Sequence, residues 1–220
     1  MVPLAVKVFP KRSLEPLHSV PSSPDAMGGD STWTRARALR SRAFWSVSGP
    51  FSLSLLSQAG FLVHLIAFLE PSVGRSAAGL AMAVTTAMAI VGRLSLGVIA
   101  DKTDQRLAAT PSLVSQAAAL AVMISSSNST LLLLSCAMYG FSVGNLITFP
   151  ALIIQREFPA ASFGMIVGLS TAITQIIYSF GPGLLGIVRD ASGSYTAALL
   201  LCISLNLIAA AIVLRRPAAG

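Results

Sequence analysis

The stretch Gly92-Arg93-Leu94-Ser95-Leu96-Gly97-Val98-Ile99-Ala100-Asp101-Lys102-Thr103-Asp104-Gln105-Arg106 joins two apolar runs of the chain. The first run ends at Asp101, a short charged connection follows, and the next run begins at Leu107. Irregular backbone is disfavoured in hydrocarbon, because its N–H and C=O groups find no water there. The pattern therefore predicts a helix that leaves a bilayer, a tight hydrophilic turn, and a helix that re-enters it.

The composition is that of a membrane protein. Of the 220 residues, 54% are hydrophobic and 10% are charged, whereas a soluble domain carries about 25% charged residues. The formal net charge is +7, which could suggest nucleic-acid binding. The charges lie between the apolar runs and not on one basic face, so we do not expect a nucleic-acid partner.

No residue pattern indicates catalysis. Cys136 and Cys202 both lie inside apolar runs, where cysteine behaves as a small buried hydrophobe. The sequence has no metal-ligand cluster, no phosphate-binding glycine loop and no Ser/His/Asp arrangement. We therefore expect neither an enzyme nor a bound metal or cofactor.

Six apolar runs follow an N-terminal segment whose composition differs from the rest of the chain. Residues 1–34 are rich in Pro, Ser and Gly after residue 10 and are predicted to be a disordered cytoplasmic tail. Residues 35–216 are predicted to form the membrane bundle, and residues 217–220 a second short tail. The runs cover residues 44–69, 76–100, 107–125, 131–154, 162–188 and 195–214. Each has roughly the 17–25 residues that a spanning helix needs, and none alternates like a barrel strand, so the fold class is an all-α bundle of six transmembrane helices.

Lys and Arg in the loops predict the orientation of the bundle. Four arginines precede the first run and form what we call the arginine collar: Arg35, Arg37, Arg40 and Arg42. With Lys102, Arg106, Arg156, Arg215 and Arg216, the collar side holds nine basic residues, against Arg75 and Arg189, two, on the opposite side. Both termini are therefore expected in the cytoplasm of a multi-pass protein of the cell (plasma or inner) membrane.

Several motifs resemble those of the major facilitator superfamily of transporters. Gly97-x-x-x-Asp101-Lys102-x-x-x-Arg106 is similar to its short interhelical loop motif. Thr103-Asp104 replaces the family's glycine, which fits the weaker copy between the eighth and ninth helices. Residues 38–45 and 60–65 resemble the seventh helix, residues 181–186 resemble a glycine-proline helix motif, and residues 193–195 resemble the start of the twelfth helix.

The resemblance covers residues 36–216 and implies the C-terminal half of a twelve-helix transporter. It is closest to monocarboxylate-transporter-like and oxalate/formate-antiporter-like members. In that family the substrate site lies between two six-helix halves, and residues 1–34 carry none of the motifs. The chain is then either a fragment or truncated product, or a half-transporter that pairs with an N-terminal six-helix half or with a second copy.

Arg93 is the leading candidate for substrate binding. It lies eight residues before Asp101, which is about 12 Å of helix rise. An ionisable group at that depth costs several kcal/mol unless it faces a cavity or a partner. The resemblance implies that Arg93 contacts a substrate carboxylate, although Ala89 stands where monocarboxylate carriers have an aspartate. The alternative is a structural arginine bonded to helix-end carbonyls or loop carboxylates.

Other polar residues have weaker functional readings. His64 could serve proton coupling, or could be a neutral, hydrogen-bonded interface histidine. Cavity-lining candidates, which interhelical hydrogen bonding explains equally well, are Gln58, Tyr139, Asn145, Gln175 and Tyr178. A gating role is expected for the loop-motif residues Gly97, Asp101, Lys102 and Arg106, and a helix kink at Gly181, Pro182 and Gly186.

These expectations combine into a function. The resemblance implies secondary active transport by alternating access, with a small anionic organic solute as substrate, such as a carboxylate that Arg93 would bind. Proton or anion exchange would supply the coupling. The alternative is a six-helix membrane scaffold without transport, including a decayed transporter fragment.

Overall fold

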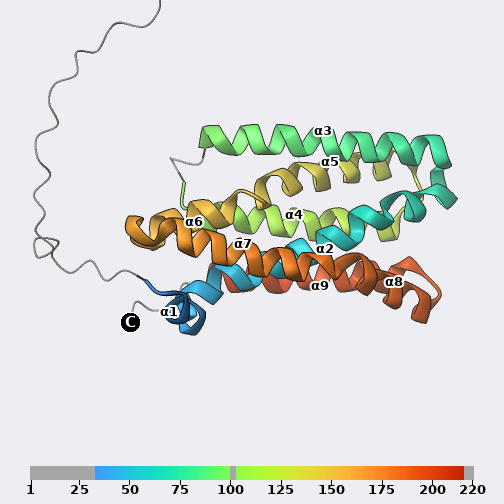
Figure 1. Ribbon diagram of the computed structural model, residues 1–220. Helices are drawn as coiled ribbons and strands as arrows, with labels where there is room; N and C mark the ends of the chain where they lie inside the picture. The colour runs from blue at the N-terminus through green and yellow to red at the C-terminus, as the bar shows by residue number, and fades with distance from the viewer. Residues whose placement is uncertain (1–32, 100–102, 216–220) are drawn as a thin grey trace, which may run out of the picture. The chain divides into compact units, whose positions relative to one another are not determined.

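The computed structural model describes residues 33–99 and 103–215, and the regular structure of this part of the chain is helical (Figure 1). Residues 1–32 of the predicted N-terminal tail, the predicted tail over residues 217–220, and the predicted loop residues Asp101 and Lys102 lie outside it. The helices are α1 (Arg35–Arg40), α2 (Arg42–Val73), α3 (Arg75–Ile99), α4 (Gln105–Ser125), α5 (Ser129–Leu146), α6 (Phe149–Glu157), α7 (Phe163–Ser179), α8 (Gly181–Ser192) and α9 (Tyr195–Leu214), with a 3₁₀ turn, η2, at Ala160–Ser162.

Six stretches of the described residues are long and apolar enough to cross a membrane. They are Arg42–Val73, Arg75–Gly97, Gln105–Ser125, Ser129–Glu157, Ala160–Ser192 and Tyr195–Leu214. Figure 1 shows them lying alongside one another, with α3 and α5 as neighbours and α2 beside α9. The predicted all-helical class with six long apolar helices is confirmed.

The first spanning helix is longer than the run from which it was predicted. The run was expected to end at residue 69, before Glu70-Pro71, but α2 continues to Val73. Pro71 lies in the last turn, where it removes one helical bond, and only two further residues follow before the helix ends. Gly74, at φ 79°, ends the helix, and its N–H donates to the Glu70 carbonyl at 2.9 Å.

Two of the expected runs are each divided into two helices. The run over residues 131–154 is interrupted at Ile147-Thr148 between α5 and α6, and Pro150 lies in the first turn of α6. The run over residues 162–188 is interrupted at Phe180 between α7 and α8, and Pro182 lies in the first turn of α8. Proline is tolerated in a first helical turn, where an N–H would have no intrahelical acceptor.

Small residues let α3 and α5 approach closely. A Cβ atom at Gly140 would clash with the Thr85 carbonyl, and one at Gly144 would clash with the Ala89 carbonyl. On the facing helix, a Cβ atom at Gly92 would clash with the Phe141 carbonyl. Such seams are typical of membrane bundles, where lipid removes the hydrophobic driving force and van der Waals contact replaces it.

Buried polar side chains link α2 to its neighbours. The Ser48 hydroxyl donates to Ser170 on α7 at 2.8 Å. On the other side of α2, the Ser54 hydroxyl donates to Asn206 Oδ1 on α9 at 2.8 Å, and Asn206 Nδ2 donates to Ser57 Oγ at 3.1 Å. These bonds satisfy polar groups that would otherwise be buried without partners, and they orient α7 and α9 against α2.

Candidate functional site

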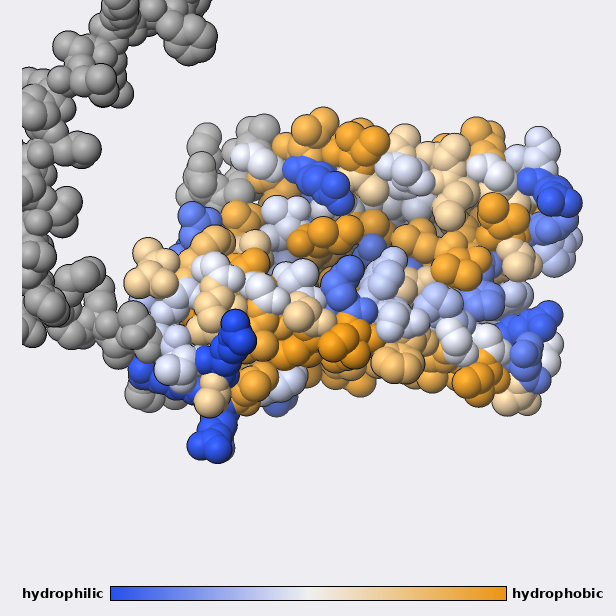
Figure 2. Space-filling model, viewed as in Figure 1, coloured by the Kyte–Doolittle hydropathy of each residue, from blue (hydrophilic) through white to orange (hydrophobic). Residues whose placement is uncertain are grey.

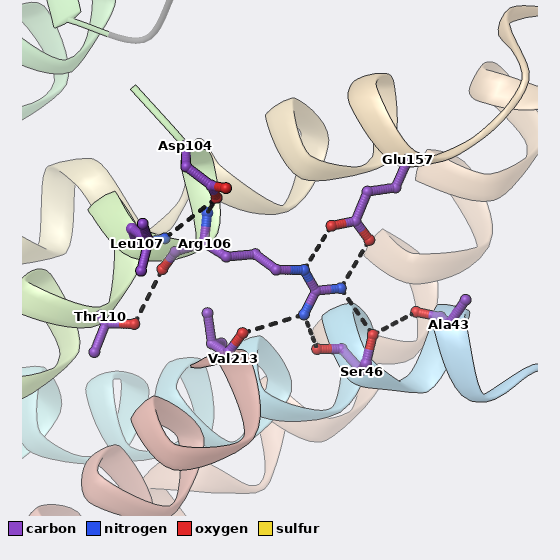
Figure 3. Close-up of polar contacts among 8 residues, drawn as sticks. All are labelled: Ala43, Ser46, Asp104, Arg106, Leu107, Thr110, Glu157 and Val213. Carbon is purple, nitrogen blue, oxygen red and sulfur yellow. Dashed lines mark hydrogen bonds and ion pairs between the residues drawn. The ribbon is translucent and has the colours of Figure 1, made fainter. Parts of the chain in front are cut away.

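The first turn of α4 carries the best-defined polar cluster in the described part of the chain. Asp104 caps this helix: its Oδ1 accepts from the backbone N–H groups of Arg106 at 3.0 Å and Leu107 at 3.5 Å (Figure 3). The cap satisfies N–H groups that a helix start leaves without acceptors. It also places Arg106 at the second residue of α4, with its side chain directed into the bundle.

The Arg106 guanidinium joins four helices (Figure 3). Its Nε and Nη2 donate to the two carboxylate oxygens of Glu157, at the end of α6, at 2.6 and 2.8 Å. Nη2 also donates to Ser46 Oγ on α2 at 2.8 Å, and Nη1 to the Val213 carbonyl on α9 at 3.2 Å. The pair with Glu157 is bidentate, the geometry that guanidinium and carboxylate groups favour. We call these residues the Arg106 cluster.

Burial makes the Arg106 cluster energetically important. The Arg106 side chain is 3% exposed, whereas that of Glu157 is 31% exposed. A buried guanidinium that lost its carboxylate would keep its desolvation cost without compensation. The cluster therefore holds the ends of α2, α4, α6 and α9 together as long as both charges are in place.

The connection before α4 and Gly97 on α3 are the other parts of the loop motif that the structure describes in part. Arg156 Nη1 donates to the Thr103 carbonyl at 2.8 Å, which ties α6 to the connection before α4. Gly97 is exposed near the end of α3, and a Cβ atom there would meet nothing within 4 Å. Asp101 and Lys102 lie outside the described residues, so their predicted roles stay predictions.

Arg93 lies on the surface of α3. Its side chain is exposed, and among residues 33–99 and 103–215 it forms no ion pair. It stands six residues before Ile99, the last residue of the helix, which is about 9 Å of rise. Helical side chains lean toward the N-terminus of their helix, so the stem of Arg93 leads away from the nearer end of α3.

The predicted cavity-lining residues do not share one surface. Gln58, Tyr139 and Asn145 are buried at 2%, 0% and 6% exposure, and each has a polar atom without a hydrogen-bond partner in the described structure. Phe61 of α2 packs edge-on against the Tyr139 ring, with centroids 4.8 Å apart. By contrast, Gln175 is exposed on α7 and Tyr178 is half-buried.

His64 is held between α8 and α9 at the opposite end of the bundle. The Pro182 carbonyl lies 3.1 Å from Nε2 and the Tyr195 hydroxyl 3.3 Å from Nδ1. Because a carbonyl only accepts, Nε2 must carry a proton, and Nδ1 of a neutral ring then accepts from Tyr195. Gly186 lies beside this ring, since a Cβ atom there would be 3.8 Å from Nε2.

The helix interruption near Pro182 coincides with another close approach. A Cβ atom at Gly60 would lie 2.7 Å from the Gly181 carbonyl oxygen, and one at Gly181 would lie 2.8 Å from the Gly60 nitrogen. Only glycine fits at both positions without moving α8 away from α2. The second segment of the fifth span, α8, thus packs closely against α2.

Three groups of the Arg106 cluster were not anticipated from the sequence. Glu157, Ser46 and the Val213 carbonyl come from helices far apart in the chain. One signal was available for Glu157, a carboxylate at the end of an apolar run on the same predicted side as Arg106. Ser46 and Val213 carried no comparable signal.

A comparison with known protein families finds a match over most of the chain. The family described as Major Facilitator Superfamily matches residues 11–220. The chain belongs to the Major Facilitator Superfamily. No curated protein matches the chain at a significant level.

Membership in the superfamily confirms several sequence predictions. Members are secondary transporters that move small molecules across membranes, so the chain is a membrane transport protein and not an enzyme. The six candidate spans make it a multi-pass protein. The match begins at residue 11, upstream of residue 36, where the motif resemblance begins.

Proposed function

We propose that the chain acts as the C-terminal six-helix half of a Major Facilitator Superfamily transporter for a small organic anion. Its partner would be an N-terminal six-helix half or a second copy, in the cell membrane and with both termini in the cytoplasm. The proposed transport proceeds by alternating access with proton or anion exchange, as the monocarboxylate- and oxalate-type resemblance implies. The lysine and arginine distribution supports the orientation.

Arg93 is the observation that carries this proposal. Its side chain is exposed on α3 beside Ile90 and Leu94, which are 58% and 68% exposed. Burying the Arg93 guanidinium in lipid would cost several kcal/mol of free energy. The side chain cannot easily avoid this cost, because its aliphatic stem leads away from the nearer membrane interface. A water-filled cavity against the other half of the transporter removes that cost, and the same charge attracts an anionic solute.

The Arg106 cluster supplies a gate in this proposal. Alternating access requires one end of the bundle to open while the other closes, and the cluster joins four helices at the collar end. Glu157 is partly exposed, so water can reach the carboxylate and lower the cost of separating the pair. Gly97, Asp101 and Lys102 are proposed to act with it, since they belong to the same loop motif as Arg106.

Arg93 variants in a complete transporter test the proposal. Arg93→Lys keeps the charge but loses the bidentate geometry, so substrate binding should weaken; Arg93→Gln should nearly abolish it. Arg75→Gln, at the exposed start of α3, is the matched control and should bind normally. The readout is direct binding of the anion per folded protein in the membrane.

The pattern of expression and affinity distinguishes the two roles of Arg93. A binding arginine leaves membrane insertion intact in Arg93→Gln, because losing a charge from a helix interior makes insertion easier. A purely structural arginine would instead lower the yield of folded protein and leave the affinity of the remainder unchanged. Unchanged affinity in Arg93→Gln would contradict the anion-binding proposal.

A further inference from the structure

The arginine collar is an exposed basic surface at the α1 end of the bundle. The side chains of Arg35, Arg37, Arg40 and Arg42 are all exposed. None of the four forms an ion pair within residues 33–99 and 103–215. Figure 2 shows strongly hydrophilic side chains gathered over α1, next to the apolar surface of the spanning helices. The collar thus presents four arginine charges to whatever medium surrounds this end of the bundle.

Two apolar side chains next to these arginines are exposed. Leu39 is 43% exposed and Trp45 is 42% exposed. The Trp45 indole Nε1–H donates to the Leu39 carbonyl at 2.8 Å, so its polar atom is satisfied and its ring remains open on one side. Tryptophan with a satisfied N–H and an exposed ring is typical of the membrane–water interface.

The collar is held in place by the bundle. The Trp33 N–H donates to Ser162 Oγ at 2.8 Å, and the Trp33 ring packs edge-on against Phe158. The Arg37 guanidinium lies 4.9 Å from the centroid of the Trp33 ring. Thr34 caps α1 and Ser41 caps α2. The arginines therefore project from a fixed platform.

The start of α2 strengthens the positive potential. Arg42 lies in its first turn, and that turn contains no acidic residue. A helix N-terminus carries a partial positive charge, so a cation there is unfavourable and an anion is favourable. Arg40 and Arg42 flank Ser41, which places two guanidinium stems next to this helix end. A bound anion would reduce the repulsion.

We propose that the arginine collar binds the headgroups of anionic phospholipids in the adjacent leaflet. The arginines hold the lipid phosphate, to which guanidinium groups donate in bidentate fashion. Leu39 and Trp45 enter the boundary between headgroups and acyl chains. A nucleic acid or an acidic peptide would satisfy the charges but would leave these two apolar side chains in water. Because α1 is joined to the spanning α2 through Ser41 alone, the collar lies at lipid headgroup level.

Tryptophan fluorescence of the full chain tests this proposal directly. The chain contains two tryptophans, Trp33 and Trp45, and both belong to the collar platform. The chain is reconstituted in nanodiscs of unlabelled phosphatidylcholine. Increasing fractions of a lipid with brominated acyl chains, which quench nearby indoles, are then added; this lipid is phosphatidylglycerol in one series and phosphatidylcholine in the other. We expect the brominated anionic lipid to associate about fivefold or more strongly than the brominated zwitterionic lipid, since each surface arginine attracts anionic lipid.

Charge variants separate a collar effect from general membrane charge. Arg40→Gln/Arg42→Gln should reduce the preference to about twofold or less, and Arg40→Lys/Arg42→Lys, which keeps the charge but loses the bidentate bonds, should give a preference between those of the Gln variant and the wild-type chain. Arg75→Gln, which changes an exposed arginine at the start of α3, beyond the opposite end of α2, should leave it unchanged. All the variants keep both tryptophans. Equal quenching of the wild-type chain by the two lipids would overturn the proposal. So would a preference for the anionic lipid that is undiminished in the Gln variant. Loss of the wild-type preference when single-stranded RNA is added would also overturn it.

Discussion

Breaking the pair between Arg106 and Glu157 should destabilise the bundle more than any exposed charge removal. Loss of one partner of a fully buried ion pair costs about 3–5 kcal/mol. The Glu157 side chain is 31% exposed, and water screens part of that loss. We therefore expect Arg106→Ala to lower the free energy of unfolding by about 2–3 kcal/mol.

The partner variant should cost at least as much, because it leaves the buried Arg106 guanidinium without a counter-charge. Glu157→Gln keeps one oxygen that can accept from Arg106 but turns an amide N–H₂ toward the second guanidinium donor. One buried donor then lacks an acceptor and the buried charge is unpaired, which costs about 3 kcal/mol. Because the two variants remove the same interaction, the double variant should be less destabilised than the sum of the singles, with a coupling of about 1–2 kcal/mol.

The assay is reversible unfolding of the chain in mixed detergent micelles, followed by loss of helical circular dichroism. Arg189→Gln is the control, because the pair between Arg189 and Asp190 has the same 2.8 Å contact but side chains that are 50% and 71% exposed. It should leave the stability essentially unchanged. A coupling near zero, or an Arg106→Ala variant as stable as the control, would refute the structural role assigned to the Arg106 cluster.

Two further predictions concern topology and packing. Cysteines introduced at Ser127 and Ser194 should react with an impermeant reagent from outside the cell, and a cysteine at Thr103 should not. The reverse pattern would contradict the proposed orientation. Native Cys136 and Cys202 are buried and should stay unlabelled. Gly144→Ala should destabilise the fold by about 1–3 kcal/mol because its Cβ meets the Ala89 carbonyl. Gly79→Ala, also on a helix but with nothing within 4 Å, should not destabilise it, and equal stability of the two variants would count against the α3–α5 seam.

The six spans could be predicted because hydropathy and length act locally. A run of about 20 apolar residues has one favourable environment, and its backbone must be helical there. The interruption at Ile147-Thr148 was missed because Pro150 was counted within an apolar run, although it lacks the N–H that a continuous helix would use. Glu70-Pro71 was expected to end the first run at residue 69, but α2 continues through Pro71 to Val73.

The candidate site was predictable only in part. The depth of Arg93 in the membrane follows from the number of residues between Arg93 and the end of its apolar run. Whether the Arg93 side chain is exposed depends on how α3 packs against α5. Arg106 and Glu157 are 51 residues apart, and nothing local to either residue specifies the other. Gln58, Tyr139 and Asn145 were grouped with Gln175 as polar residues in membrane runs, yet three are buried and one is exposed. Which face of a helix is buried is decided by the neighbouring helices.

Uptake measured with and without a partner half tests the central proposal most directly. The 220-residue chain is expressed alone, and together with the N-terminal six-helix half of a monocarboxylate-transporter-like member, and uptake of radiolabelled lactate, formate and oxalate is followed. We expect the chain alone to insert without transporting, and the pair to take up at least one of these anions in a manner that Arg93→Gln abolishes. Robust uptake by the purified chain as a monomer would contradict the proposal that its substrate site is shared with a second half.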